Sequence, residues 1–188
     1  MTLEESSNQK TEVINREIEA DQKILDLVQA AKKDQNAFYF LYLHFVDRIY
    51  FYILRRVGSH LDAEDLSSEV FIRAMKHIHR FDERNSFAAW LFRIARNLTV
   101  DHYRANRTVL LNLNDENFTL AEKSPDTETM LQLKDQLRKL EPDELDLLNL
   151  RYTARLTFVE MGQLLGKRPD AVCKAHNKIL EHLRLNLE

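Results

Sequence analysis

The segment from residue 81 to residue 107 holds the residues whose types and spacing offer the most specific chemistry in this sequence. Read as a helix from about Ser86, with roughly 100° between residues, it gathers Asn97, Val100 and several arginines on one face. These arginines are Arg93, Arg96, Arg104 and Arg107. A guanidinium group can donate two parallel hydrogen bonds to a phosphate, so an arginine face favours a polyanion. The other side is apolar and suits a core: Leu91, Ile94, Ala95 and Leu98.

Aromatic side chains crowd the start of the same segment: Phe81, Phe87, Trp90 and Phe92. Unpaired bases stack on aromatic rings, so arginines beside aromatics favour a nucleic-acid strand with exposed bases. Two plainer interpretations stay open. The segment could be a surface helix with a solvated basic stripe, and Trp90 could be a core residue.

The chain as a whole is mildly acidic, with a net charge of −3 over 188 residues and a pI near 6.2. Any nucleic-acid contact must therefore come from a local patch, and this background suits a contact that depends on a partner. Cys173 is the single cysteine, which excludes an internal disulfide and indicates a reducing compartment. No apolar run approaches the roughly 18–20 residues that span a bilayer, and the polar residues 1–20 are unlike a signal peptide. We expect a soluble, cytoplasmic protein.

Residues that break helices are few, with 3 glycines and 3 prolines, which predicts an all-α fold. Apolar residues that recur every three or four positions predict four helices in the first half of the chain, beginning near residues 21, 36, 62 and 86. Gly58 is expected to end the second helix and Asp62 to cap the third. We expect residues 21–107 to form one helical domain, preceded by a polar extension over residues 1–20.

The third predicted helix carries an acidic flank formed by Asp62, Asp65 and Glu69. Negative charge at a helix N-terminus is stabilising by itself, so capping and the helix dipole account for the first of these residues. Glu69 lies beyond the first turn and is less well explained in this way. The flank is therefore a candidate surface for a basic partner.

The second half of the chain predicts a linker and another helical domain. Acidic residues accumulate over residues 108–128, where the apolar periodicity stops, so this stretch is expected to be a flexible linker. In residues 129–188, Pro142 marks a helix start, and Thr157 with Glu160 forms a capping box. A short helix that ends at Gly166 and a longer one that follows are typical of a helix-turn-helix.

Together these motifs resemble a known family. The first set resembles the second region of bacterial sigma factors of the sigma-70 family, in particular the two-domain extracytoplasmic-function (ECF) type. It consists of the run 62–66, Glu69-Val70-Phe71, Phe81-Asp82, Ser86-Phe87, Ala89-Trp90-Leu91 and the run 93–97. The second set resembles the fourth region of that type: Leu140, Pro142, Leu148, Arg151-Tyr152, Leu156-Thr157, Glu160-Met161, the run 164–166 and Val172.

The resemblance implies a factor that binds core RNA polymerase and directs promoter recognition, minus-ten melting and transcription initiation. The β′ clamp helices and the β flap are the implied polymerase contacts. Residues implied to contact the polymerase are Asp62, Asp65, Leu66, Glu69 and Phe71. An anti-sigma factor or a recruiting DNA-targeting protein are further partners that the resemblance allows.

The resemblance also implies two promoter contacts. The minus-ten element would be bound and melted by Phe81, Arg84, Asn85, Ser86, Phe87, Trp90, Arg93, Arg96, Asn97, Arg104 and Arg107. Among these, Asn97 is the candidate for a contact to a base edge. The upstream minus-thirty-five element would be bound by Thr157, Arg168, Lys174, Asn177 and Lys178.

The final predicted helix departs from the family pattern because its outward face is nearly balanced in charge, with Asp170 and Glu181 beside Lys174 and Lys178. Such a face gains little from the release of counterions. We therefore expect weak reading of the upstream element and dependence on a recruiting partner. The other possibility is an unusual but adequate set of contacts from Arg168, Lys174, Asn177 and Lys178.

Other functional classes explain less of the sequence. Its 7 histidines are scattered, and no HExxH, paired CxxC or glycine-rich phosphate loop is present, so neither an enzyme nor a cofactor or metal site is expected. A helix-turn-helix regulator that acts without polymerase would explain the second domain but leaves the 62–97 motifs unexplained. A scaffold would explain the acidic linker but not the aligned arginines.

Overall fold

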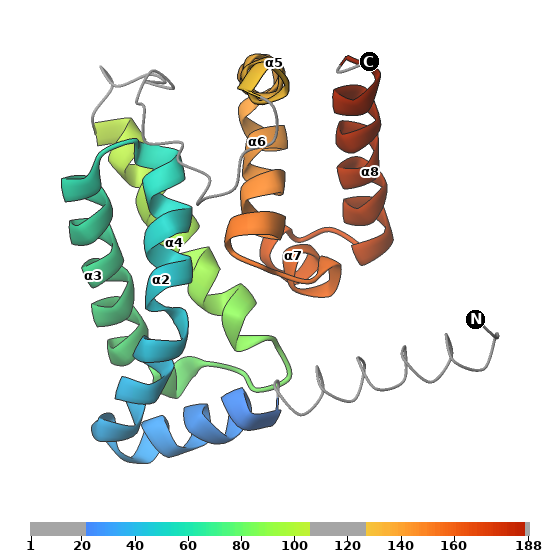
Figure 1. Cartoon of the computed structure of the whole chain (residues 1–188). Helices are drawn as coiled ribbons and strands as arrows, with labels where there is room; N and C mark the ends of the chain where they lie inside the picture. The colour runs from blue at the N-terminus through green and yellow to red at the C-terminus, as the bar shows by residue number, and fades with distance from the viewer. Residues whose placement is uncertain (1–21, 106–126, 187–188) are drawn as a thin grey trace.

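The computed structural model describes residues 22–105 and 127–186, and every regular element in these ranges is helical (Figure 1). The all-α prediction is therefore confirmed. The N-terminal extension, Arg107 and residues 108–126 of the acidic stretch lie outside the described residues. Within the described ranges, no helix has the length and apolar character needed to cross a membrane.

The first helical unit, residues 22–105, is a bundle built around α2. It contains a helix over 22–33, then η1 (Gln35–Ala37), α2 (Phe38–Val57), α3 (His60–His77), η2 (Ile78–Arg80) and α4 (Phe87–Ala105). The inner face of α2 buries residues at spacings of three and four: Leu41, Phe45, Ile49, Tyr52 and Ile53. Helices α3 and α4 pack against it (Figure 1).

The predicted end of α2 is confirmed, whereas the predicted start of α3 is not. Gly58 ends α2 with φ of 72°, a left-handed conformation that favours glycine. The prediction that Asp62 caps α3 is wrong, because the helix begins two residues earlier. Ser59 is the cap, and its side chain accepts a hydrogen bond from the backbone amide of Asp62.

The second helical unit, residues 127–186, consists of α5 (Thr127–Arg138), α6 (Pro142–Leu148), the π-helical turn η3 (Asn149–Thr153), α7 (Phe158–Leu165) and α8 (Pro169–Leu185). The capping box of Thr157 and Glu160 is present at the start of α7. Gly166 follows α7 with φ of 66°. Helices α7 and α8 thus form the predicted helix-turn-helix. Glycine is also required at position 162 within α7, where the turn packs against the helix, because a Cβ there would lie 2.7 Å from the carbonyl oxygen of Lys167.

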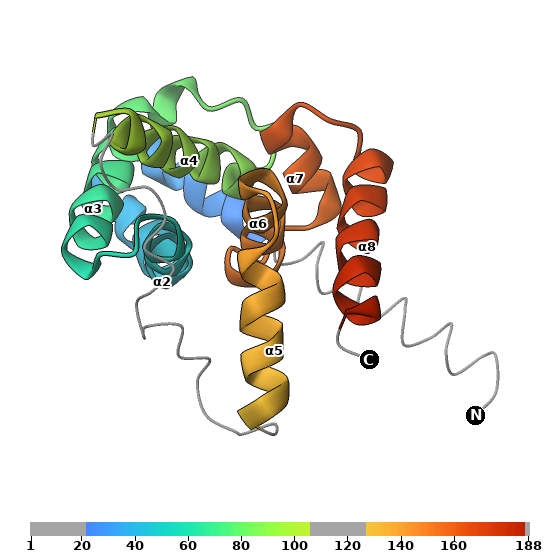
Figure 2. The ribbon, with the colours of Figure 1, turned by 90° about the horizontal axis from the view of Figure 1, so that it is seen from above.

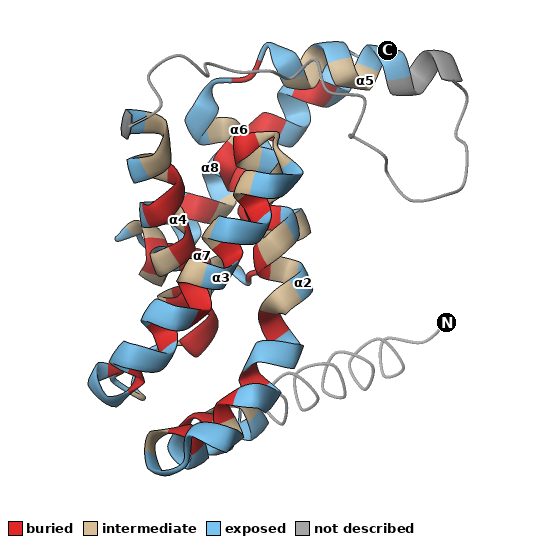
Figure 3. Cartoon of the chain, turned by 90° about the vertical axis from the view of Figure 1, so that its left-hand side faces the viewer, coloured by how far each residue is buried: buried red, intermediate tan, exposed pale blue. Residues whose placement is uncertain are grey.

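The two units pack against each other through α6, η3 and α7, which lie beside α2 and α4, whereas α8 lies on the far side (Figures 1 and 2). Buried residues line the facing sides of the helices and exposed ones their outer sides (Figure 3). Polar contacts join the units as well. Arg48 donates to the carbonyl of Ala154 at 2.6 and 2.9 Å, and the Asn149 side chain donates to the carbonyl of Tyr52 at 3.0 Å.

Candidate nucleic-acid interface

Helix α4 has the two faces that its residue spacing predicts. Leu91, Ala95 and Leu98 are buried in the bundle. The opposite face carries the exposed Arg93, Asn97 and Arg104 and the half-buried Arg96. The helix begins at Phe87, and the hydroxyl of Ser86 accepts a hydrogen bond from the backbone amide of Ala89 at 3.3 Å. This bond satisfies a donor of the first turn and orients the arginine face.

The loop before α4 is closed by an ion pair between two exposed side chains, Asp82 and Arg84. Their closest approach is 2.6 Å, from Nη2 to Oδ2. Hydrogen bonds from Arg84 hold the pKa of Asp82 down at about 2. The backbone of Asn85 also donates to the carbonyl of Asp82 at 3.0 Å. Arg84 is therefore accessible to a phosphate, but its charge is already matched within the loop.

The aromatic residues at the start of α4 form a packed cluster. The ring of Phe87 lies 5.4 Å from the rings of both Phe81 and Trp90, and Phe81 lies 5.5 Å from Trp90. Phe81 and Phe87 are only 4% and 2% exposed, so the structure places both in the core instead of opening them to bases. Helical spacing alone does not distinguish a core ring from a ring that binds a base. Trp90 is half-buried and keeps some contact with solvent.

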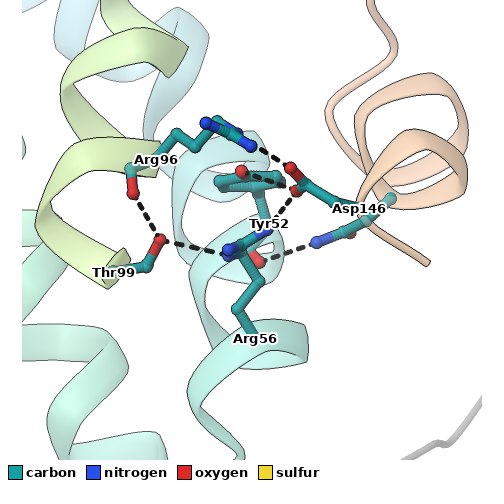
Figure 4. Close-up of polar contacts among 6 residues, drawn as sticks. Tyr52, Arg56, Arg96, Thr99 and Asp146 are labelled. Carbon is teal, nitrogen blue, oxygen red and sulfur yellow. Dashed lines mark hydrogen bonds and ion pairs between the residues drawn. The ribbon is translucent and has the colours of Figure 1, made fainter. Parts of the chain in front are cut away.

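A buried carboxylate from the second unit reaches the arginine face of α4 (Figure 4). Asp146 of α6 is 6% exposed. One of its oxygens accepts from Nη1 of Arg56 and from the hydroxyl of Tyr52 at 3.0 Å, and the other accepts from Nε of Arg96 at 2.9 Å. Arg56 also donates to the hydroxyl of Thr99 at 3.1 Å. These five side chains are called the Asp146 cluster below.

The protonation state of Tyr52 favours the observed bonds in this cluster. Burial raises the pKa of Tyr52 well above its ordinary range, and the charge of Asp146 raises it further. The Tyr52 hydroxyl thus keeps its proton and donates to the carboxylate. Two guanidinium groups and one hydroxyl together satisfy Asp146, which is what a buried charge requires.

Helix α7 covers the start of the same face. The side-chain oxygen of Gln163 accepts from the backbone amide of Ser86 at 2.9 Å, and the Gln163 carbonyl accepts from Arg93 at 2.5 Å. The Ser86 hydroxyl donates to Glu160 at 2.7 Å. Three of the predicted minus-ten residues, Ser86, Arg93 and Arg96, are therefore bonded to the second unit.

The acidic flank of α3 lies on another part of the first unit. Asp65 is exposed, and Asp62 and Glu69 are partly exposed. Glu69 forms an ion pair with Arg73 at 2.6 Å. Phe71, the predicted polymerase contact on this helix, is 6% exposed and packs its ring 4.9 Å from that of Tyr42. Phe71 thus supports the flank from inside the bundle. Leu66 is partly buried beside it.

Helix α8 exposes the upstream candidates Lys174, Asn177 and Lys178. Arg168 is exposed but forms an ion pair with Asp170 at 3.1 Å. Thr157 is occupied in the capping box of α7. On the inner side, His176 is buried and lies within hydrogen-bond distance of Tyr152, at 3.1 Å between Nε2 and the hydroxyl. The exposed face keeps the near balance of charge that the sequence predicts.

Sequence reasoning did not identify Arg56 and Asp146 as parts of the polar cluster at the arginine face of α4. One signal was present, because Asp146 interrupts a run of leucines at 145, 147 and 148 on a short helix. A carboxylate in an apolar run needs cationic partners if it is buried. Arg56 could be assigned from sequence only to the last turn of α2. Nothing local indicates that it pairs with a residue 90 positions away.

Comparison with known proteins agrees with these features. The family model for sigma-70 region 2 matches residues 41–109. The chain is 34% identical over 159 residues to the ECF RNA polymerase sigma factor BldN of Streptomyces coelicolor, covering 80% of this chain and 60% of BldN. It is 42% identical over 79 residues to the ECF RNA polymerase sigma factor SigW of Bacillus subtilis, covering 42% of each chain. The chain thus spans less than two thirds of either relative.

A solved structure shares the fold. It contains the sigma factor RpoE in complex with the anti-sigma factor NepR from Bartonella quintana, and the match has a TM-score of 0.63 at 18% identity. The match covers 80% of this chain and 96% of the solved one. The helical fold of the chain is thus that of a solved sigma factor. The chain belongs to the sigma-70 family and to its ECF type.

Proposed function

We propose that this chain binds core RNA polymerase and directs promoter recognition, minus-ten melting and the start of transcription. The observation that carries the proposal is helix α4, whose arginine face and buried apolar face lie within the match to sigma-70 region 2. The curated relatives are named as RNA polymerase sigma factors. This favours the sigma-factor role over a helix-turn-helix regulator that works without polymerase. The role is one of binding in the cytoplasm, with no catalysis by the chain itself.

Each part of α4 has a distinct role in this proposal. Arg93, Arg96 and Arg104 hold phosphates of the minus-ten strand and so position it, because contacts to phosphate carry no sequence information. Asn97 is exposed on the same face and can read a base edge through its amide. Trp90 offers a stacking surface for an unpaired base, worth about 1–3 kcal/mol per base.

The loop before α4 completes the minus-ten site. Arg84, Asn85 and Ser86 present polar groups to the strand beside the helix. Phe81 and Phe87 act from the core, where their packing fixes the loop against the first turn of α4. Arg107 lies outside the described residues and is kept as a candidate for a phosphate contact on its residue type alone.

Docking on the polymerase is assigned to the acidic flank of α3. Asp62, Asp65 and Glu69 present negative charge on one side of the helix, which suits the β′ clamp helices through complementary basic groups. Leu66 adds apolar surface beside these carboxylates, and Phe71 supports them from inside. The second unit would contact the β flap.

Upstream promoter binding is proposed to be weak. The exposed face of α8 has few unmatched positive charges, and Arg168 is paired with Asp170. Lys174, Asn177 and Lys178 are the remaining candidates for phosphate contacts. A recruiting DNA-targeting protein would then help to place the factor on its promoters. An anti-sigma factor is a second proposed partner, as RpoE is bound to NepR in the similar structure.

Reconstitution of the full chain with bacterial core polymerase on a promoter library tests the proposal. The expected result is a defined set of start sites that share a minus-ten element and vary upstream. Polymerase without the chain serves as the control. Absence of start-site selection, together with absence of polymerase binding in a pull-down, would contradict the assignment.

A further inference from the structure

We propose that the second unit inhibits the first by placing Asp146 where a promoter phosphate would bind. The two units then form a closed state that competes with DNA for the arginine face of α4. This inference rests on the proposed function, because it assumes that Arg93 and Arg96 bind the promoter. It adds a regulatory contact built into the chain itself.

The Asp146 cluster offers the arginines the same chemistry as a phosphate. A carboxylate and a phosphate both accept charge-assisted hydrogen bonds from guanidinium groups. Asp146 takes bonds from Arg96 and Arg56 from within the interface between the units, and it is almost fully buried. While these bonds persist, Nε of Arg96 is not available to a phosphate (Figure 4).

Helix α7 blocks the adjacent part of the arginine face. Arg93 donates to the backbone carbonyl of Gln163, and Ser86 is bonded to the side chains of Gln163 and Glu160. These contacts come from a different helix than Asp146 but cover the same side of α4. In this arrangement of the two units, Ser86, Arg93 and Arg96 are therefore engaged by two separate sets of hydrogen bonds.

The closed state is built so that it can open. Solvent reaches the edge of the Asp146 cluster at Arg96, whose side chain is 33% exposed. Separation of the units would hydrate both guanidinium groups and the carboxylate. A buried ion pair confers specificity more than strength, because its desolvation offsets much of its attraction. Binding of polymerase to both units would therefore shift the population toward the open state.

The closed state also predicts how free protein behaves toward DNA. When only a fraction of the molecules is competent, the apparent dissociation constant rises by the inverse of that fraction. A variant that abolishes the closed state should thus bind DNA more tightly, although no DNA contact has been added. If Asp146 had a purely structural role, its loss would only disturb the packing of the protein. The variant would then bind DNA no more tightly than the parent chain.

The test uses the full chain without polymerase and a fluorescent single-stranded oligonucleotide that carries the minus-ten element selected in the reconstitution. The variant Asp146→Asn keeps the shape of the side chain but removes the charge that holds the arginines. Asp143→Asn, at an exposed position in the first turn of α6, is the matched control. Small-angle X-ray scattering reports the separation of the units, and circular dichroism reports folding.

The expected result for Asp146→Asn is a larger radius of gyration and oligonucleotide binding that is tighter by about tenfold, as for a closed fraction near nine tenths. Asp143→Asn should match the parent chain in both measurements. If Asp146→Asn fails to fold, Gln163→Ala decides by the same criteria, since it removes the side-chain bond to Ser86. A folded variant with unchanged or weaker oligonucleotide binding would overturn the proposal.

The two proposals can fail separately. If the parent chain selects start sites with core polymerase but the opened variant binds the oligonucleotide no better, the closed state has no inhibitory role and the sigma-factor function stands. If the parent chain selects no start sites with polymerase, the function itself fails.

Discussion

The substitution Tyr52→Phe isolates one bond of the Asp146 cluster. The Tyr52 ring is fully buried, and its hydroxyl donates to Asp146 at 3.0 Å. Phenylalanine keeps the ring and its edge-on packing against Phe92, at 5.4 Å between centroids, so no large cavity forms. The loss is confined to a hydrogen bond to a charged acceptor, which contributes about 1.5–3 kcal/mol. We expect the free energy of unfolding to fall by that amount.

The assay is urea unfolding of the full chain, followed by circular dichroism and by tryptophan fluorescence from Trp90. Tyr50→Phe is the matched control, because its hydroxyl lies 2.6 Å from Nδ1 of His60 at a more exposed position. The control should change stability by less than about 1 kcal/mol. Equal and small effects of both substitutions would refute the reasoning. They would mean that the Tyr52 bond to Asp146 does not form in solution.

Three other predictions address the remaining surfaces. Asp65→Lys on the acidic flank should weaken binding to core polymerase in a pull-down and leave oligonucleotide binding by the free chain unchanged; unaltered polymerase binding would remove the flank from that interface. Arg84→Ala should raise the pKa of Asp82 from about 2 toward its ordinary value in an NMR titration, because the hydrogen bonds from Arg84 are removed. In the parent chain the Asp82–Arg84 contact is complete above the ordinary aspartate pKa and is lost as the pH falls toward 2. An unshifted pKa in the variant would contradict the pairing. Gly162→Ala should destabilise the chain by about 1–3 kcal/mol in thermal unfolding, since its Cβ would lie 2.7 Å from the Lys167 carbonyl; a neutral effect would show that the turn can shift.

Much of the helical fold is predictable from local sequence signals. The two faces of α4 follow from the spacing of its leucines and arginines. The helix-turn-helix follows from the Thr157 capping box and from Gly166, because both act within a few residues of the chain. Such local signals can also be ambiguous, as they are at the start of α3. The sequence predicts Asp62 as the cap there, whereas the structure has Ser59. Serine and aspartate are both good caps, and they lie three residues apart there.

The interface between the units was not predictable. The contacts of Asp146 join residues 50 and 90 positions apart in the sequence, so no periodicity records them. The sequence also does not show whether an aromatic ring lies in the core or faces solvent. Phe71, Phe81 and Phe87 match motifs that the resemblance assigns to binding, yet all three are buried. Their contribution to those surfaces comes through packing.

The proposed function depends above all on the action of the α4 arginine face in promoter opening. Open-complex formation with core polymerase, on a promoter that carries 2-aminopurine in the minus-ten element, tests this action. Arg93→Ala is the perturbation, and Arg138→Ala, at an exposed position on α5, is the control. In the proposed open state polymerase holds the units apart, so the contact of Arg93 with Gln163 should not affect the result.

We expect Arg93→Ala to lower the yield of open complex by about tenfold or more, because one charge-assisted contact of about 1.5–3 kcal/mol is lost. Polymerase binding by the variant, measured in parallel, should equal that of the parent chain and of Arg138→Ala. An unchanged yield of open complex, or an equal loss of polymerase binding, would contradict the claim.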